Sequence, residues 1–493
     1  MKSKSVKKSL EVNAVLNIIK QCCAIIFPLI TFPYISRTLG SEGYGIYSFS
    51  WSFVSYFVML AALGIHTYSV REGARIRDND KKIEQFTAQV FTINLISSII
   101  SLSLLYVIAL SSEKISKCIL YISIQSIDIV LSLFGRDWLN SIYEDYFYIT
   151  IRYIIIQFIA LVAMFVLVRN SEDVWIYCVL AIFASFGGNI PNMIYTRRYA
   201  NLKVTSNINL KKHLLPLFTL FANTIAMMVF VNSDIIMLGF FYDQKTVGIY
   251  SLSSKVYSMI KQMLNAIVIV ALPRVTNVMA RNIDDYKLLL KNIFNYLIII
   301  LLPVSCGLFM ISDSVILLAG GSQYIGGNPA MKVLAVSVIF AMIGSFMMNC
   351  VLIANRKDTN CFTSTLTAAT ANIILNLILI KRIGIIGAAI TTLAAEVINA
   401  CLMTFYSKQI IKDRIINVKN LMECLIGSSG VIVVCMIANG VIENIVLRTL
   451  CAVTASIIVY VAFMLAIKNV YFRGFMVPVL NRISNIEKRR KKI

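Results

Sequence analysis

Four lysines lie inside, or at the edge of, long apolar segments of this sequence, where a charged residue is unusual. Lys20, Lys255 and Lys261 lie within such segments, and Lys332 lies at the edge of another. A lysine near the centre of a bilayer costs about 2.5–3.5 kcal/mol on insertion scales, so it is expected to face protein or a water-filled cavity. Fixed cations in such a cavity attract an anionic group. The first three lysines are therefore candidate substrate-binding residues, whereas Lys332 is expected to extend its amine to the membrane surface.

Structural alternatives remain open for two of these lysines. Lys20 is only about two helical turns into its segment, so its amine could also reach the membrane surface. Lys255 has a possible partner in Asp234, which lies at a similar depth near the end of the preceding apolar segment. Asp234 is therefore assigned to the same cationic site, either as part of the binding surface or as a structural ion-pair partner.

Two further carboxylates lie in apolar segments. Asp128 shares a helical face with Gln125 and Ser132, and Glu396 shares one with neighbouring polar residues near the middle of its segment. Carboxylates inside membrane segments are candidate proton or cation sites, so Glu396 and Asp128 are predicted to couple transport to an ion. The alternative is a hydrogen-bonded contact between packed helices.

The sequence offers no enzymatic or metal-binding motif. The eleven cysteines show no CxxC or Cys/His metal spacing, and the two histidines are far apart. No GxxxxGK[ST] phosphate-binding loop is present, so ATP hydrolysis is not expected. We predict no catalytic residues, no metal and no cofactor.

Composition indicates that the elements positioning these residues are membrane-spanning helices. The chain has 493 residues, of which 58% are hydrophobic and 14% charged, and its mean hydropathy is +0.78. Soluble domains carry about 25% charged residues, and about 20 apolar residues span a bilayer as a helix. The basic N-terminal start leads directly into a full-length span, so no cleavable signal peptide is expected. Fourteen spans are predicted, near residues 13–34, 45–65, 86–108, 118–134, 151–168, 174–195, 214–238, 248–271, 291–311, 331–353, 361–380, 385–407, 422–439 and 446–468.

The basic residues predict the orientation of these spans. With a cytoplasmic N-terminus, the inside segments hold 34 Lys and Arg residues and the outside loops hold 8. Cytoplasmic loops of membrane proteins carry this excess, so both termini are predicted to be cytoplasmic. The formal net charge of +22 is then explained by attraction to anionic lipid, and no nucleic-acid partner is expected.

A short internal repeat predicts two pseudo-symmetric halves. GIYSFS at 45–50 follows the first span, and GIYSLS at 248–253 follows the seventh. Repeats of the same orientation are related by an axis along the membrane normal. We predict a lobe of six spans at 1–213, a second lobe of six spans at 214–421, and an appendage of two spans with a basic tail at 422–493.

The first of these repeats resembles a known family. The run FPLITFPYISRTLGSEGYGIYSFSWSFVSYF at 27–57, with YSVREGARIRD at 68–78, resembles the start of Wzx-type oligosaccharide flippases, which transport O-antigen or capsule repeat units. That family belongs to the multidrug/oligosaccharidyl-lipid/polysaccharide exporter superfamily. The segment NSDIIMLGFF…VGIYSLSSKV at 232–256 is similar to the opening of the family's second half.

This resemblance implies a function and a location. The protein would move an undecaprenyl-pyrophosphate-linked oligosaccharide from the cytoplasmic to the outer leaflet of a bacterial cytoplasmic (inner) membrane. In such a two-lobe exporter, spans 1, 2, 7 and 8 line the cleft between the lobes, which would place Lys20, Lys255 and Lys261 in a cationic cleft. Partners would be the lipid-linked oligosaccharide, membrane lipid, and a polysaccharide polymerase or chain-length protein.

Three alternatives are weighed against this function. A multidrug or cation antiporter of the same fold is disfavoured because cationic drugs suit an acidic cleft. A membrane-embedded polysaccharide polymerase or acyltransferase would need a large outer loop or catalytic His or Glu groups. A receptor or scaffold gives no reason for lysines within the membrane.

Overall fold

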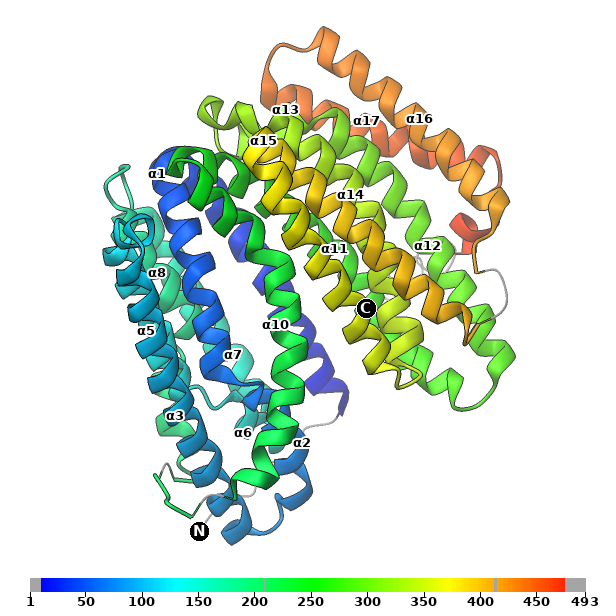
Figure 1. The fold of residues 1–493 in the computed structure, drawn as a ribbon. Coiled ribbons are helices and arrows are strands. Elements are labelled where there is room, and N and C mark those ends of the chain that lie inside the picture. Colours follow the sequence, from blue (N-terminus) through cyan, green and yellow to red (C-terminus); the bar gives the residue numbers. More distant parts are fainter. Residues whose placement is uncertain (1–9, 202, 208, 412–414, 475–493) are drawn as a thin grey trace, which may run out of the picture. The chain divides into compact units, whose positions relative to one another are not determined.

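The regular secondary structure of the protein is helical throughout the part that the structure describes. The computed structural model describes residues 10–201, 203–207, 209–411 and 415–474, and no strand occurs among them (Figure 1). By contacts the chain divides into two compact units, Met1–Ser251 and Leu252–Ile493, here called unit 1 and unit 2. The predicted all-α integral membrane fold is confirmed.

Unit 1 contains ten helices and the start of an eleventh among its described residues. They are α1 (Leu10–Ala62), α2 (Ile65–Ile76), α3 (Asp80–Ser111), α4 (Glu113–Ser116), α5 (Ile119–Leu133), α6 (Asp137–Ile142), α7 (Tyr146–Leu167), α8 (Val174–Phe186), α9 (Asn189–Thr196) and α10 (Leu210–Phe241), followed by the start of α11 (Gln244–Met279).

Unit 2 contains the rest of α11 and the helices that follow it. They are α12 (Ile283–Met310), α13 (Ser312–Ala319), the 3₁₀-helix η1 (Ser322–Gly327), α14 (Asn328–Phe346), the π-helical turn η2 (Met347–Ile353), α15 (Asp358–Lys408), α16 (Val418–Val441) and α17 (Ile445–Ala466).

Twelve segments of the described chain are long and apolar enough to cross a membrane. Two of them, Ile19–Ile76 with 58 residues and Asp358–Lys408 with 51, are more than twice the length that one crossing needs. Each contains a pair of the predicted spans, the first and second or the eleventh and twelfth. The exact count of fourteen crossings remains a prediction.

The first long segment reverses direction at Gly40. This residue has φ of +72°, a conformation that glycine adopts without steric cost, inside the otherwise continuous α1. The rings of Phe32 and Tyr44 lie 5.6 Å apart, although twelve residues of straight helix would separate them by about 18 Å. The chain therefore folds back on itself where the sequence predicts a short turn.

The second long segment reverses in the same way at Ile383 and Gly384, where the backbone leaves helical geometry and Gly384 has φ of +59°. The Thr391 hydroxyl donates a hydrogen bond to the Asn376 side chain, although fifteen residues of straight helix span about 22 Å. The polar contact therefore joins the two arms of a helical hairpin within α15.

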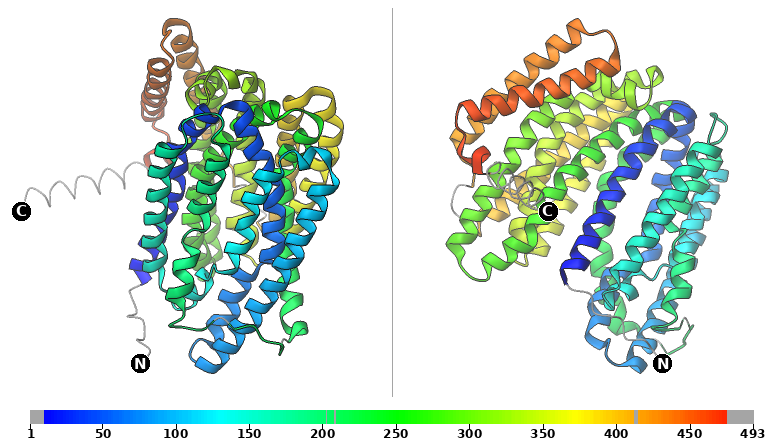
Figure 2. Two further views of the ribbon diagram at one scale, coloured as in Figure 1. Left: turned by 90° about the vertical axis from the view of Figure 1, so that its left-hand side faces the viewer. Right: turned by 180° about the vertical axis from the view of Figure 1, so that it is seen from behind.

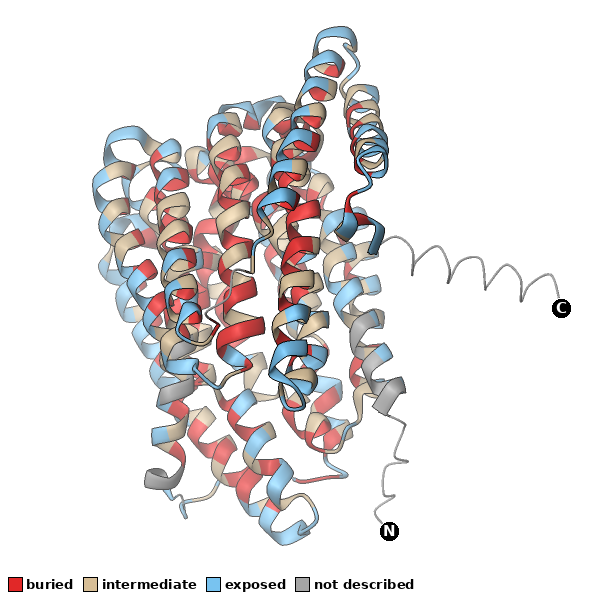
Figure 3. Ribbon diagram, turned by 90° about the vertical axis from the view of Figure 1, so that its right-hand side faces the viewer, coloured by how far each residue is buried: buried red, intermediate tan, exposed pale blue. Residues whose placement is uncertain are grey.

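Apolar side chains cover long outer faces of the helices. Large exposed hydrophobic residues recur along α3, α7, α16 and α17, and examples are Val107, Phe158, Ile437 and Ile458. Figure 3 shows buried, intermediate and exposed positions alternating along the helices that face the viewer. A soluble protein rarely exposes apolar surface on this scale, so these faces are suited to contact lipid. The chain is a multi-span membrane protein.

The predicted outer loops of unit 1 meet at one end of that unit. The Tyr34 hydroxyl, on the first arm of α1, donates to the Val168 carbonyl at the end of α7, at 2.6 Å. At the same end, the Lys114 amine donates to the Phe240 carbonyl at the end of α10. These contacts join segments that the sequence predicts on one side of the membrane, and the orientation itself remains a prediction.

The two copies of the repeated GIYS sequence contact each other directly. A Cβ atom built on Gly45 would lie 1.8 Å from the Gln244 carbonyl oxygen, and one on Gly248 would lie 1.7 Å from that of Ser41. Each glycine thus faces the carbonyl four residues before the other, so the contact is reciprocal. Glycines at such a contact let two helix backbones approach closely.

The division into units differs from the predicted lobe boundary at 213/214. Helix α10, the predicted first span of the second lobe, packs against α1 and α2 in unit 1. The Asn232 amide of α10 donates to the Ser55 hydroxyl of α1 at 3.1 Å. Packing and repeat symmetry are different properties of the chain, and the repeat-based division into 1–213, 214–421 and 422–493 remains a proposal.

Helices α16 and α17, the predicted appendage, pack against α12 within unit 2 (Figure 2). The Tyr460 hydroxyl of α17 donates to the Ile299 carbonyl of α12 at 2.8 Å. The Asn420 amide of α16 donates to the Asn295 side chain of α12 at 3.1 Å. Buried hydrogen bonds of this kind fix the position of α16 and α17 on α12.

Candidate functional site

Unit 1 encloses a polar cavity of about 300 Å³ where α1, α2, α6 and α7 meet. Most of its lining side chains carry hydrogen-bonding or charged groups. They are Lys20 from α1, His66 and Val70 from α2, Asp137 and Ser141 from α6, and Tyr146, Ile149 and Thr150 from α7.

The acidic residue of this cavity is already neutralised by the protein. Arg152 donates from Nη2 to Asp137 Oδ1 at 2.6 Å, and the Asn192 amide donates to the same oxygen at 2.9 Å. Arg152 is largely buried, with 10% of its side chain exposed. A charged pair with a further hydrogen bond can remain in a low-dielectric site, and it leaves the other cation of the cavity uncompensated.

Lys20 supplies that cation. Its amine lies 5.6 Å from the centre of the Tyr153 ring, a cation–π contact with α7. Within the described residues it forms no ion pair. The Thr150 hydroxyl, also in the cavity, donates to the Leu16 carbonyl at 3.2 Å and holds α7 against α1. The cavity therefore combines a fixed positive charge with neutral hydrogen-bonding groups, which is suited to an anionic ligand.

In unit 2, the membrane lysine Lys261 has an ion-pair partner. Lys261 of α11 donates to Glu396 of α15, with 2.5 Å between Nζ and Oε1, and the Tyr257 hydroxyl donates to the same oxygen at 2.7 Å. Glu396 is buried, with 2% of its side chain exposed, whereas Lys261 keeps 31% exposed. Sequence reasoning assigns these residues to separate groups, a cationic site and an ion-coupling site, but the structure joins them.

A polar face of α11 accounts for this contact. Ser251, Ser254, Ser258, Lys261 and Asn265 share one helical face. One turn beyond the ion pair, the Ser345 hydroxyl of α14 donates to the Asn265 side chain at 2.5 Å. In unit 2 the polar face thus packs toward α14 and α15.

The other two members of the predicted cationic site fall in different units. Asp234, in unit 1, is buried and accepts a hydrogen bond from the Tyr250 hydroxyl at 2.7 Å. Lys255 belongs to unit 2 and is exposed. Their pairing, and the substrate-binding role assigned to both, remain predictions.

Asp128 lies in α5 with its side chain fully buried. Neither of its carboxylate oxygens has a hydrogen-bond partner among the described residues. One turn away, the Gln125 amide donates to the Tyr47 carbonyl at 3.4 Å. A buried ionised carboxylate without a partner is costly in a low-dielectric environment. The predicted packing alternative, a hydrogen-bonded contact, is not what the described residues form.

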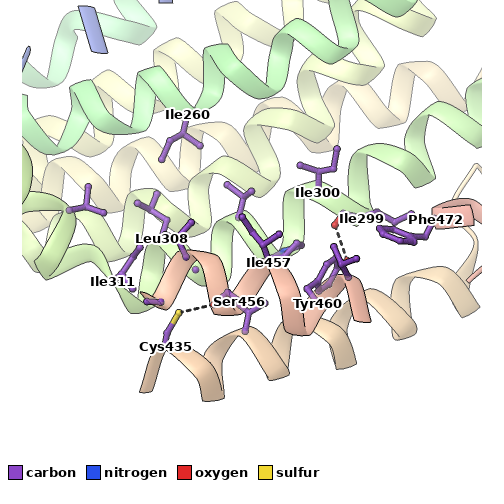
Figure 4. A pocket seen from close by; sticks show the side chains of 18 residues that line it. Ile260, Ile299, Ile300, Leu308, Ile311, Cys435, Ser456, Ile457, Tyr460 and Phe472 are labelled. Carbon is purple, nitrogen blue, oxygen red and sulfur yellow. Dashed lines mark hydrogen bonds between the residues drawn. The ribbon is translucent and has the colours of Figure 1, made fainter. Parts of the chain in front are cut away.

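An apolar cavity of about 460 Å³ lies in unit 2 among α11, α12, α16 and α17 (Figure 4). The side chains labelled in Figure 4 include Ile260, Ile300, Leu308 and Ile457, with Tyr460 and Phe472 at one end. The polar atoms near it are engaged, since the Tyr460 hydroxyl donates to the α12 backbone. The cavity is suited to a hydrocarbon chain.

Candidate metal ligands do not gather anywhere in the described part of the chain. No three His, Cys, Asp or Glu side chains there are arranged to hold a metal ion. The described cysteines are not paired in disulfides, and most lie buried or half-buried in helices.

Comparison with known sequences assigns the family. A model of the family described as polysaccharide biosynthesis protein matches residues 12–279, more than half of the chain. The chain belongs to this family. The matched region contains Lys20, the polar cavity of unit 1, Lys261 and both copies of the repeat.

A related protein supports the assignment of this chain to the family. A protein of Escherichia coli (strain K12) named "Putative O-antigen transporter" is 24% identical over 409 residues, which cover 81% of this chain and 97% of that protein. The predicted membership of the oligosaccharide-flippase type is confirmed by this match and the family model. The chain is thus a transporter of the polysaccharide biosynthesis type.

Solved structures agree with the fold. The inward closed conformation of the lipid II flippase MurJ superposes with a TM-score of 0.71 at 15% identity, covering 94% of this chain and 99% of that one. An inward-facing multidrug resistance MATE transporter of the MOP superfamily gives 0.58 at 16% identity, covering 81% and 94%. At such identities the likeness concerns the fold alone.

Sequence reasoning missed several residues of the unit 1 cavity and of the Lys261–Glu396 contact. His66, Asp137 and Arg152 lie near span ends, where charged and polar residues usually indicate loops or orientation. Tyr257 is one of many aromatic residues that the sequence assigns to packing. For His66, the signal that could have found it is its position opposite Lys20 across one predicted helical hairpin.

Proposed function

We propose that this protein is a secondary flippase that moves an undecaprenyl-pyrophosphate-linked oligosaccharide from the cytoplasmic to the outer leaflet for surface polysaccharide synthesis. The observation that carries the proposal is the polar cavity of unit 1, in which Lys20 has no ion-pair partner among the described residues. A cation held in a membrane unit without a counter-ion needs an anionic ligand to offset it.

The chemistry of the substrate fits the two kinds of cavity. A pyrophosphate group is compact and multiply charged, and it loses part of its hydration within the membrane. Lys20 can replace that hydration, and a lysine binds phosphate as a point charge without the bidentate geometry that would slow release. Considered by itself, the apolar cavity of unit 2 is suited to a hydrocarbon chain such as a polyprenyl group. The relative whose name is "Putative O-antigen transporter" supports this class of substrate.

Several features of the predicted transport cycle belong to this proposal. Without an ATP-binding motif, the motion would be driven by the substrate or by an ion gradient. A charge crossing the membrane is worth about 2.3 kcal/mol per 100 mV, and Glu396 and Asp128 are the proposed coupling groups. The protein would reside in a bacterial cytoplasmic membrane with both termini in the cytoplasm, near a polymerase or chain-length protein.

The proposal is tested by deleting the gene in its host. We expect surface polysaccharide to be lost and lipid-linked repeat units to accumulate in the inner leaflet, with recovery from a plasmid copy. A multidrug exporter of the same fold would instead leave polysaccharide normal and raise drug sensitivity. Loss of polysaccharide without accumulated lipid-linked units would point to a synthetic enzyme, and either result would overturn the proposal.

A further inference from the structure

We infer that Glu396 is an internal counter-ion that occupies the anion-binding position on Lys261 in the substrate-free protein, and that the substrate's pyrophosphate displaces it. The inference rests on the proposed function and adds a residue that determines which anions bind. It assigns Glu396 to substrate selection, which is a different role from ion coupling.

The geometry places the carboxylate where a ligand phosphate would bind. Lys261 Nζ and Glu396 Oε1 are 2.5 Å apart, in direct contact as the partners of a charge-assisted hydrogen bond are. A phosphate oxygen would make the same contact with the amine. The two anions therefore compete for one donor group.

The exposure of the two partners is unequal, and this asymmetry favours exchange. About a third of the Lys261 side chain is exposed, whereas 2% of that of Glu396 is exposed. A ligand can therefore approach the exposed side of the amine and draw it away from the carboxylate, which stays in its buried place. A buried ion pair repays its desolvation only when its geometry is good and its other donors and acceptors are hydrogen-bonded, and here one partner is partly exposed.

Tyr257 lowers the free-energy cost of the displaced state. Its hydroxyl donates to Glu396 Oε1 at 2.7 Å, and its ring centre lies 5.7 Å from Lys261 Nζ. When the amine turns to a ligand, the carboxylate keeps this hydrogen bond. A buried carboxylate that retains a donor costs less than one that loses every partner.

Helix α14 and the turn η2, both described in full, place no further charged side chain at this level. Helix α14 and η2, which pack on α15, carry Lys332 and Cys350 as their titratable side chains. Lys332 lies over the Phe309 ring, near the start of α14 and about three turns from Gly344. Gly344 is the residue that approaches Asn399 beside Glu396. Lys261 and Tyr257 are thus the groups that determine the state of this carboxylate.

Because Glu396 carries one negative charge, a ligand must carry more than one to displace it from Lys261. A neutral amphiphile gains nothing from Lys261, and a carboxylate-bearing one only matches Glu396. A pyrophosphate carries more than one negative charge, so it can outcompete the internal carboxylate. The pair would therefore select multiply charged lipid phosphates over other membrane lipids.

The test measures binding of farnesyl pyrophosphate, a short polyprenyl pyrophosphate, to the purified full-length protein in detergent. We expect Glu396→Gln to bind this probe about tenfold more tightly than the wild type, because the competing charge is gone. Lys261→Met should bind it about tenfold more weakly. Glu396→Asp keeps the charge but shortens the reach to Lys261, so its affinity should fall between those of the wild type and Glu396→Gln.

The matched control is Glu423→Gln, a carboxylate of unit 2 that accepts a hydrogen bond from Asn469 and should leave probe affinity unchanged. Farnesol, which lacks the phosphates, should show no difference among the variants. Unchanged or weaker binding by both Glu396 variants would overturn the counter-ion role while leaving the proposed function intact. No binding of the probe by the wild type would instead count against the proposed substrate class.

Discussion

The two units of this protein each hold a lysine within the membrane, but they compensate its charge in opposite ways. In unit 1 Lys20 lies in a polar cavity whose one lining carboxylate, Asp137, is already paired with Arg152. In unit 2 Lys261 is paired with Glu396. One unit thus presents an available cation, and the other a cation that is offset until something displaces its partner. Under the proposed function, both lysines would bind anions, and the neighbours of each would determine when its charge is accessible.

Removing the available cation should have the largest effect. We expect Lys20→Ala to reduce export of surface polysaccharide about a hundredfold, because an interaction of about 2–3 kcal/mol with the pyrophosphate is lost. Lys20→Arg should recover part of the activity, since it restores the charge. The measurement is surface polysaccharide at matched protein levels in the membrane. Lys332→Ala removes a lysine that lies over the Phe309 ring, and cells carrying it should export polysaccharide normally. Equal losses from the two alanine variants would contradict the assignment of Lys20, and not Lys332, to substrate binding.

The second prediction is that removing Lys261 lowers the free energy of unfolding more than removing Lys20. Lys261→Met leaves Glu396 buried without its cation, and we expect a loss of about 2–3 kcal/mol in unfolding free energy, below the range for fully buried pairs because Lys261 is partly exposed. Adding Glu396→Gln to that variant should recover most of the loss. Lys20→Met should change stability by less than about 0.5 kcal/mol. Thermal unfolding in detergent measures all three, and an equal loss for both lysines would contradict the comparison.

The smallest effect on stability is expected at Asp128. Its side chain has no hydrogen-bond partner among the described residues, so the neutral amide in Asp128→Asn should change unfolding free energy by less than about 0.5 kcal/mol. If Asp128 carries a proton during transport, this variant should nevertheless lose its response to an imposed proton gradient. Gradient-driven transport in vesicles tests this, and a full response would leave Asp128 with no role in coupling.

Much of the fold follows from apolar length and a few glycines. The spans could be placed because a run of about 20 apolar residues matches the thickness of a bilayer and is rare in soluble helices. The turn at Gly40 was predictable from its position between two such spans. The repeated GIYS sequence indicated two related halves, but sequence periodicity alone could not show that Gly45 and Gly248 would contact each other.

The candidate sites were less accessible to sequence reasoning. Helical spacing correctly placed Lys261 and Glu396 on polar faces, but a face does not identify its partner, which here is 135 residues away. Asp137 and Arg152 looked like loop charges because their roles depend on how α6 and α7 pack. The residues of the apolar cavity, such as Ile300 and Ile457, have the same composition as lipid-facing positions, so no pattern distinguishes them.

The central claim is tested most directly by a flipping assay with purified protein in vesicles that contain a lipid-linked oligosaccharide. An enzyme or label added outside would measure how fast the substrate reaches the outer leaflet. We expect the wild type to equilibrate the substrate between leaflets, and the Lys20→Ala/Lys261→Ala double variant to remain near the rate of protein-free vesicles. Equal rates for the wild type and the double variant would contradict the account.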